Sequence, residues 1–157
     1  MSRSPAPPPE VRPVGAEQTR SLRHSVLRPS SSFETTVYPK DDDPETRHFG
    51  AFEGDRLVGI ASLYREDRPG AEDRRHPGAE WRLRGMATAP DDRGRGAGRT
   101  LLAGCVAHVA ATGGGLLWCN ARVPAVGFYR AGGLEVEGDE FDIPGIGPHV
   151  VMVRAVP

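Results

Sequence analysis

A short segment rich in glycine and arginine, residues 93–100, places the tightest limits on what this chain can form. It follows a strand-like stretch that ends at Pro90, and it opens the clearest amphipathic helix of the chain. Glycines allow sharp turns that point several backbone N–H groups at one anion, and a helix start adds unpaired N–H donors and a positive dipole end. Arginine side chains add charge for phosphate oxygens. The pattern therefore predicts a phosphate-binding loop, formed by Arg93, Gly94, Arg95, Gly96, Ala97, Gly98, Arg99 and Thr100.

Two common phosphate loops do not fit these residues. A P-loop needs glycine at position 93 and Gly-Lys-Ser/Thr at positions 98–100, but this chain has Arg93 and Arg99 there. A dinucleotide-binding loop that starts at Gly94 needs glycine at position 99. These mismatches count against a nucleoside triphosphatase and against a dinucleotide-binding protein. A flexible turn before a helix remains the alternative for so short a motif.

Hydrophobic periodicity and turn residues on both sides of the loop predict one mixed α/β domain over residues 11–157. Residues 1–10 contain four prolines and are expected to be disordered. Residues 65–79 are expected to form a long exposed loop, and residues 141–149 a loop on the acceptor side. The expected strands are 11–14, 48–52, 57–64, 81–89, 116–119, 134–137 and 150–154, and the expected helices are 16–27, 99–112 and 124–131.

Composition excludes several classes of function. The formal net charge is −1 over 157 residues, so no strong basic field attracts nucleic acid or an anionic membrane. No apolar run approaches the ~20 residues that span a bilayer, and the polar N-terminus does not resemble a signal peptide, so we expect a cytoplasmic protein. Cys105 and Cys119 lie too far apart in sequence for a close-spaced metal pair, so we expect reduced core thiols and no metal. The acidic run at residues 41–43 is expected to be a solvated loop.

The pattern Arg-x-x-Gly-x-Gly, met by Arg93, Gly96 and Gly98, resembles the acyl-CoA pyrophosphate loop of the GNAT acetyltransferases. Residues 84–90 resemble the central strand of that family, and residues 117–134 resemble its later Asn and Phe-Tyr segment. Residues 22–29, 41–50 and 145–149 resemble more narrowly the ElaA-like bacterial branch. The resemblance implies an α/β (α+β) GNAT fold, with a mixed central sheet of about six to seven strands flanked by about four helices.

This resemblance also implies an activity. We expect an N-acetyltransferase that moves an acetyl group from acetyl-CoA (coenzyme A) to a primary amine of a small molecule, by direct attack in a ternary complex. A homodimer paired through a sheet edge is expected as well. Two alternatives stay open, a non-catalytic acyl-CoA sensor and a nucleic-acid-binding protein that uses the arginine-rich loop. The identity of the amine and the choice between acetyl and longer acyl donors are not determined by the sequence.

Site residues outside the loop follow from the same resemblance. Tyr129 occupies the general-acid position, and Met86, Ala87 and Thr88 offer backbone to the cofactor and N–H donors to the oxyanion. Asn120 either binds the pantetheine arm or caps a helix.

The general base is assigned less directly. Glu80, His48 and His149 are the candidates, with Glu80 placed first. His108 is expected to be a surface or packing histidine. Three arginines are candidates for an acidic acceptor, although solvated side chains are the favoured interpretation: Arg23, Arg28 and Arg47.

Overall fold

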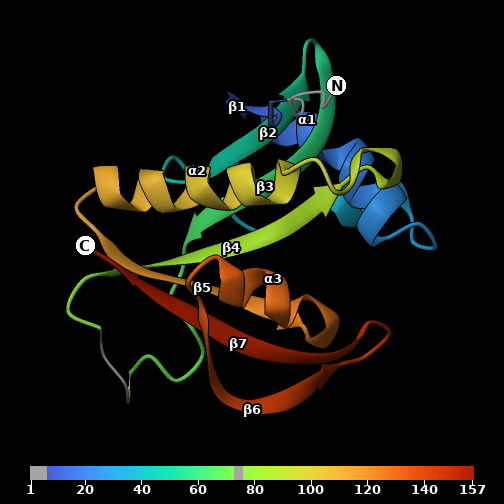
Figure 1. Cartoon of the computed structure of the whole chain (residues 1–157). Helices are drawn as coiled ribbons and strands as arrows, with labels where there is room; N and C mark the ends of the chain where they lie inside the picture. Colours follow the sequence, from blue (N-terminus) through green and yellow to red (C-terminus); the bar gives the residue numbers. More distant parts are fainter. Residues whose placement is uncertain (1–6, 73–75) are drawn as a thin grey trace, which may run out of the picture. The chain divides into compact units, whose positions relative to one another are not determined.

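The structure is a computed structural model, and it describes residues 7–72 and 76–157. Its regular elements follow the expected order (Figure 1). The strands are β1 (Glu10–Val14), β2 (Arg47–Glu53), β3 (Arg56–Arg65), β4 (Ala79–Thr88), β5 (Gly115–Arg122), β6 (Glu135–Ile143) and β7 (Gly147–Val156). The helices are α1 (Ala16–Leu22), α2 (Ala97–Ala111) and α3 (Val126–Ala131), with a π-helical turn at Arg23–Leu27 and short 3₁₀ turns at Phe33–Thr36, Pro90–Asp92 and Val123–Ala125.

The described strands form one hydrogen-bonded sheet in the order β1-β2-β3-β4-β5-β7-β6. β1 pairs with β2 antiparallel, β4 pairs with β5 parallel, and β7 pairs antiparallel with both β5 and β6. The parallel step requires a crossover connection, which α2 supplies. The sheet is therefore mixed and seven-stranded, and the predicted α/β class is confirmed.

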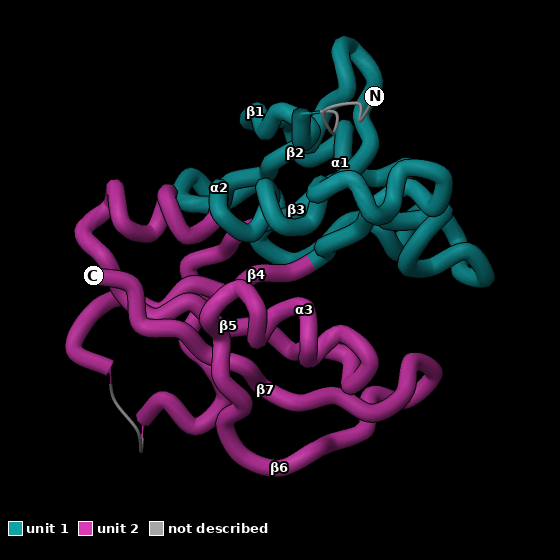
Figure 2. Tube along the Cα trace, viewed as in Figure 1, with its two compact units in different colours: residues 1–62, 85–104 teal, residues 63–84, 105–157 magenta. Residues whose placement is uncertain are grey.

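The described chain falls into two compact units (Figure 2). The first comprises Met1–Ser62 and Gly85–Gly104, and the second comprises Leu63–Arg84 and Cys105–Pro157. The expectation of a single domain over residues 11–157 stays a prediction.

Each unit has its own buried apolar side chains. In the first unit, Val58, Ile60 and Leu101 are almost completely buried. A Cβ atom added at Gly59 would lie 3.1 Å from Leu101 Cδ1, so the glycine lets α2 pack closely on β3. The buried positions of the second unit include Leu117, Trp118, Cys105, Val109, Leu134 and Met152.

Most expected elements are confirmed with shifted ends, and one expectation is wrong. Residues 141–149 belong largely to the hairpin of β6 and β7, in which Phe141 pairs with His149 and Ile143 with Gly147. Only the first part of β6 was expected as a strand, at residues 134–137. The rest was missed because its side chains are mainly acidic and exposed, so no hydrophobic alternation marks it, and its hydrogen bonds to β7 hold it in the sheet.

Two expectations fall partly on residues outside the described ranges. Of the segment 1–10, residues 1–6 are outside them, whereas Pro9 is buried and Glu10 begins β1. Of the loop 65–79, residues 73–75 are outside them, and β4 begins at Ala79. No helix in the described part of the chain is long and apolar enough to cross a membrane.

Candidate functional site

The glycine-rich loop has the backbone conformation that its sequence requires. Gly94 and Gly96 adopt positive φ angles of 80° and 89°, a region that other residues enter only with strain. The bond from Thr100 N–H to Gly96 O, 3.0 Å long, closes the first turn of α2. The N–H groups at the start of that turn have no helical carbonyl to bind. The loop therefore presents an anion-binding helix start.

This loop borders a groove of about 950 Å³ in the first unit. Gly94, Arg95, Gly96, Arg99 and Thr100 all line the groove, so these predicted cofactor residues lie together. The other lining residues are Pro7, Pro8, Pro9, Glu10, Arg12, Phe52, Glu53 and Gly54.

The three arginines of the loop have different electrostatic surroundings. Arg95 lies 3.1 Å from Glu53 Oε2 and 3.7 Å from Asp92 Oδ1. Arg93 and Arg99 are exposed and make no ion pair with any residue in the ranges 7–72 and 76–157. Arg93 and Arg99 are thus the loop cations left for an incoming anion.

The last part of β4 carries a local irregularity beside the predicted cofactor backbone. Gly85 has φ 68° within an otherwise extended strand, which is typical of a β-bulge and of a locally interrupted ladder. A Cβ atom at this position would lie 3.3 Å from Tyr38 Cε2 and 3.6 Å from Arg23 Nε. Met86, Ala87 and Thr88 follow directly, so a glycine bulge braced by two buried side chains precedes them.

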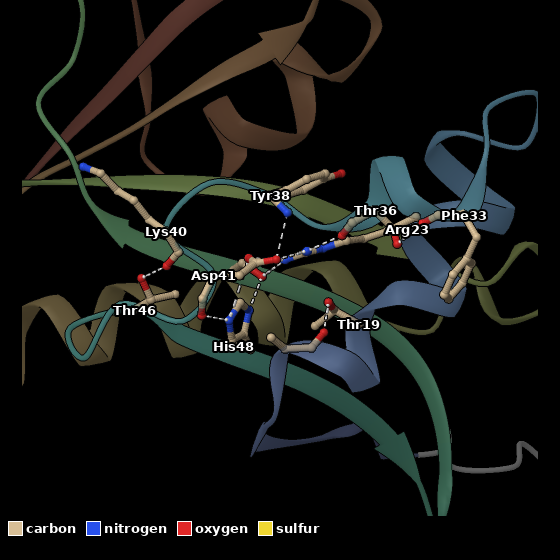
Figure 3. Close-up of polar contacts among 11 residues, drawn as sticks. Thr19, Arg23, Phe33, Thr36, Tyr38, Lys40, Asp41, Thr46 and His48 are labelled. Carbon is tan, nitrogen blue, oxygen red and sulfur yellow. Dashed lines mark hydrogen bonds and ion pairs between the residues drawn. The ribbon is translucent and has the colours of Figure 1, made fainter.

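A buried polar network lies in the first unit (Figure 3). Arg23 is completely buried and forms a bidentate pair with Asp41, with distances of 2.7 and 3.1 Å. Arg23 also donates to Thr36 O at 2.7 Å and to Ser62 Oγ at 2.9 Å, and its guanidinium lies 4.0 Å from the centre of the Tyr38 ring.

The two ring nitrogens of His48 complete this network, and their contacts fit one neutral tautomer. Its Nε2 lies 3.0 Å from the carbonyl oxygen of Asp41, which only accepts, so Nε2 carries the proton. Ser62 Oγ accepts from Arg23 and lies 2.7 Å from His48 Nδ1, so the hydroxyl proton points at Nδ1. The lone pair of His48 is therefore already engaged.

These contacts correct two expectations. Arg23 is not solvated, and Asp41 of the acidic run is buried, because each neutralises the other. Of the other candidate arginines, Arg47 is exposed and donates to the carbonyls of Pro44 and Thr46, as a solvated side chain can, whereas Arg28 is half-buried, with its guanidinium 5.3 Å from the centre of the Tyr38 ring.

In the second unit, Tyr129 of α3 is buried, with 8% of its surface exposed. Burial raises the pKa of its phenol above the usual value, the nearby thiols of Cys119 and Cys105 raise it further, and Arg122 opposes them. The phenol is therefore protonated at neutral pH. Burial also raises the pKa of each of those two thiols to about 12, which confirms buried, reduced cysteines.

Asn120 of β5 has a side-chain oxygen that lacks a partner. Its Oδ1 is buried and accepts no hydrogen bond from any described residue. Such an orphaned acceptor is costly unless a ligand or water satisfies it. This fits a bound amide-containing group better than a helix-capping role, because β5 and not a helix carries the residue.

The remaining acid–base candidates differ in what they already bind. Glu80 is buried, and its Oε1 lies 2.6 Å from Arg68 Nη1 and accepts from the Arg68 backbone N–H at 3.1 Å. His149 lies with Nδ1 2.7 Å from Gly147 O, so Nδ1 donates to that carbonyl, and Nε2 makes no hydrogen bond to any described residue. His108 packs edge-on against Trp81 at 5.5 Å, as a packing histidine would.

Three charged residues that form buried or part-buried ion pairs were not identified as important from the sequence: Arg56, Arg68 and Asp92. Arg68 was placed in an exposed loop but is buried between Glu80 and Glu137. Asp92 stands beside Asp91 in the same acidic pair, and nothing in the sequence separates the buried carboxylate from the exposed one.

Comparison with known proteins agrees with this geometry. The family described as "Acetyltransferase (GNAT) family" matches residues 16–133. An uncharacterised N-acetyltransferase of Bacillus subtilis (strain 168), YitI, is 37% identical over 147 residues, which is 94% of this chain and 96% of that protein.

Solved structures share the fold at lower identity. ElaA of Escherichia coli has a TM-score of 0.66 at 18% identity, covering 93% of this chain and 99% of its own. NAA60 of Arabidopsis thaliana, solved in complex with acetyl-CoA, has a TM-score of 0.72 at 12% identity, covering 94% and 98%. At such identities the likeness shows the fold, so the ElaA-like branch stays a prediction. The match over most of the chain and the close bacterial relative show that this chain belongs to the GNAT family of acetyltransferases, enzymes that use acetyl-CoA.

Proposed function

We propose that this acetyltransferase moves the acetyl group of acetyl-CoA to a primary amine of a small molecule, by direct attack in a ternary complex. The observation that carries the proposal is the glycine loop at the start of α2, where Gly94 and Gly96 take left-handed conformations and Arg93 and Arg99 make no ion pair within the described ranges. A polyanionic cofactor matches unpaired N–H groups and uncommitted guanidinium groups.

Several predicted site residues have the chemistry that this cofactor requires. Residues 93–100 would hold its phosphates, the backbone of residues 86–88 would pair with its pantetheine arm, and Asn120 Oδ1 would accept from a pantetheine amide N–H. When bound, acetyl-CoA supplies a thioester whose carbonyl carbon is the electrophile. The protein has to provide the proton transfers and the stabilisation of charge.

Two of these tasks have candidate groups. Backbone N–H donors of residues 86–88, after the bulge at Gly85, would stabilise the developing oxyanion. Tyr129 would donate its phenolic hydrogen to the departing sulfur. A thiol has an unperturbed pKa of about 8.5 and the phenol is more basic than that, so hydrogen-bond donation describes this role better than complete proton release.

The third task is removal of a proton from the amine, whose pKa is about 10 for a lysine-like group. A base needs an available lone pair. Glu80 holds Arg68, and Nδ1 of His48 accepts from Ser62. His149 keeps Nε2 as an acceptor, so its geometry favours it over Glu80 and His48 as the base.

Isothermal titration with acetyl-CoA and with ATP tests the cofactor assignment. Gly96→Glu should abolish acetyl-CoA binding, because it forces a strained backbone angle and places a carboxylate at the phosphate loop. Gly113→Glu is the matched control, because Gly113 follows the other end of α2, also has a positive φ, and has open space around it.

Wild-type and Gly113→Glu proteins that bind acetyl-CoA, with no binding by Gly96→Glu, would support the proposal. Failure of the wild-type protein to bind acetyl-CoA, or tighter binding of ATP, would overturn it. Thiol release from acetyl-CoA in the presence of a panel of small primary amines then identifies the acceptor.

A further inference from the structure

Little side-chain packing holds the glycine loop in its shape. A Cβ atom at Gly94 would meet no atom within 4 Å, and one at Gly96 would meet only Pro8 Cβ, at 3.5 Å. Two left-handed glycines in open surroundings, one on each side of Arg95, also leave a large conformational freedom to be lost when the loop orders. Apart from Ala97, which is buried, packing contributes little at these positions, so other contacts have to help keep the N–H groups in place.

A ring of four alternating charges connects the loop to the β2–β3 hairpin, all within the first unit. Asp92, the last residue of the 3₁₀ turn before the loop, receives two hydrogen bonds of 2.8 Å from Arg56 at the start of β3. Arg56 also reaches Glu53 at 3.1 Å. Arg95 of the loop returns to Glu53 at 3.1 Å and to Asp92 at 3.7 Å. We name Glu53, Arg56, Asp92 and Arg95 the loop clasp.

Asp92 is the central member of the clasp. Only 3% of its surface is exposed, although the side chains of Arg56 and Arg95 are more than half exposed. An isolated surface ion pair contributes little, but a bidentate pair within a network on a buried carboxylate is the arrangement in which such pairs matter. The hydrogen bonds from Arg56 also hold the pKa of Asp92 below its usual value, so the carboxylate of Asp92 is charged at any physiological pH.

We propose that the loop clasp, centred on Asp92, is a positioning device that holds the glycine loop in its cofactor-binding shape. Asp92 itself does not touch the cofactor. The loop arginines then have two different roles. Arg95 holds the loop through its ion pairs, whereas Arg93 and Arg99 are available to bind the phosphates. This inference rests on the proposed role of residues 93–100 in holding the phosphates of acetyl-CoA.

Charge and positioning predict opposite effects when Asp92 is neutralised. Loss of a negative charge beside a phosphate site should by charge alone tighten the binding of a polyanion. If Asp92 positions the loop, Asp92→Asn should weaken it, because the apparent dissociation constant rises as the competent fraction of the loop falls. A loop that keeps its binding shape a tenth of the time would bind about tenfold more weakly.

The experiment is isothermal titration of full-length protein with acetyl-CoA and with CoA, for the wild type, Asp92→Asn, Asp92→Glu and Asp91→Asn. Asp91 is the matched control because it is the preceding residue, carries the same charge and is exposed, with no side-chain hydrogen bond or ion pair to any described residue. Thermal melting of each variant verifies that it is folded at the titration temperature.

The clasp predicts about tenfold weaker binding for Asp92→Asn, recovery of at least part of the affinity in Asp92→Glu, and unchanged or slightly tighter binding for Asp91→Asn. Equal or tighter binding by Asp92→Asn would overturn it, as would a loss of the same size in Asp91→Asn. If Asp92→Asn fails to fold, Glu53→Gln provides the second test, because loss of this negative charge should tighten binding by charge alone, whereas loss of a clasp member should weaken it. Absence of acetyl-CoA binding by the wild type would contradict the proposed function itself, which separates the two failures.

Discussion

At the scale of single residues, burial determines what Tyr129 can contribute. Its phenol has a raised pKa and makes no hydrogen bond to the described part of the chain, so it offers one uncommitted donor in apolar surroundings. A hydrogen bond from such a donor is stronger than the same bond in water. A phenol kept protonated across the neutral range is suited to a group that gains negative charge during the reaction, as a departing thiolate does.

Tyr129→Phe is therefore expected to lower kcat by about a hundredfold and to leave the Kd for acetyl-CoA unchanged within about twofold. Phenylalanine keeps the packing and removes only the hydroxyl group. Steady-state acetyl transfer to the identified amine gives kcat, and titration gives Kd. A variant with normal kcat would show that the hydroxyl has no part in thiol departure.

The same assay assigns the general base. His149→Ala should remove most of the activity and flatten the acidic limb of the pH profile, because Nε2 of His149 is the lone pair left available. Glu80→Gln should act mainly on stability, since Glu80 holds Arg68. The opposite result, a flattened limb in Glu80→Gln alone, would restore Glu80 as the base.

At the scale of elements, the buried Arg23–Asp41 pair connects segments that local sequence preferences leave loosely defined. Arg23 lies in the π-helical turn after α1, Asp41 in the long segment before β2, and Ser62 in β3. That long segment has only one short 3₁₀ turn of its own. The ion pair therefore fixes the path of the segment before β2. Tyr38 of the same segment lies against Arg23 and next to Gly85.

Arg23→Met should reduce the free energy of unfolding by about 3–5 kcal/mol, because it leaves Asp41 buried without its guanidinium partner. Chemical denaturation with urea measures the loss. The double variant Arg23→Met/Asp41→Leu should regain part of it, since no unpaired charge remains, and Arg130→Met on the exposed face of α3 should stay within about 0.5 kcal/mol of wild type. A small effect of Arg23→Met would indicate that water reaches the pair.

Local patterns in the sequence were sufficient to predict the elements whose apolar face is buried, and insufficient where charge carries the structure. The helix with Leu101, Cys105 and Val109 on one face was predicted to within a few residues, as was the hairpin before it. β6 was predicted too short because acidic residues line it. The glycine loop was found from its residues, whereas the clasp that Asp92 forms depends on contacts 36 positions apart and has no local signature.

At the scale of the whole molecule, the two units carry different parts of the chemistry. The first contains the glycine loop, the loop clasp and the Arg23 network. The second contains Tyr129, Asn120 and both cysteines. The buried thiols of Cys105 and Cys119 and the buried phenol of Tyr129, whose raised pKa values keep them protonated, all lie in the second unit, so that unit has a distinct dependence on alkaline pH.

That dependence gives a prediction for unfolding. Each thiol has a pKa near 9.0 when exposed and about 12 when folded, so between these values the unfolded chain loses protons that the folded chain keeps. The contribution of each thiol to stability is complete below pH 9 and declines as pH rises, by up to about 1.4 kcal/mol per pH unit. The phenol of Tyr129 adds to the decline above pH 10.

Thermal melting from pH 8 to pH 11 should therefore show a falling Tm, and the fall should be shallower in Cys105→Ala. Few basic side chains titrate over this pH range, because arginines stay charged throughout and Lys40 is the sole lysine. The comparison uses the slope of Tm against pH and not Tm itself, since removal of a buried sulfur also leaves a small cavity. Equal slopes in both proteins, or rapid labelling of native thiols by a disulfide reagent at pH 8, would mean that solvent reaches Cys105 in the folded state and that burial does not set its pKa.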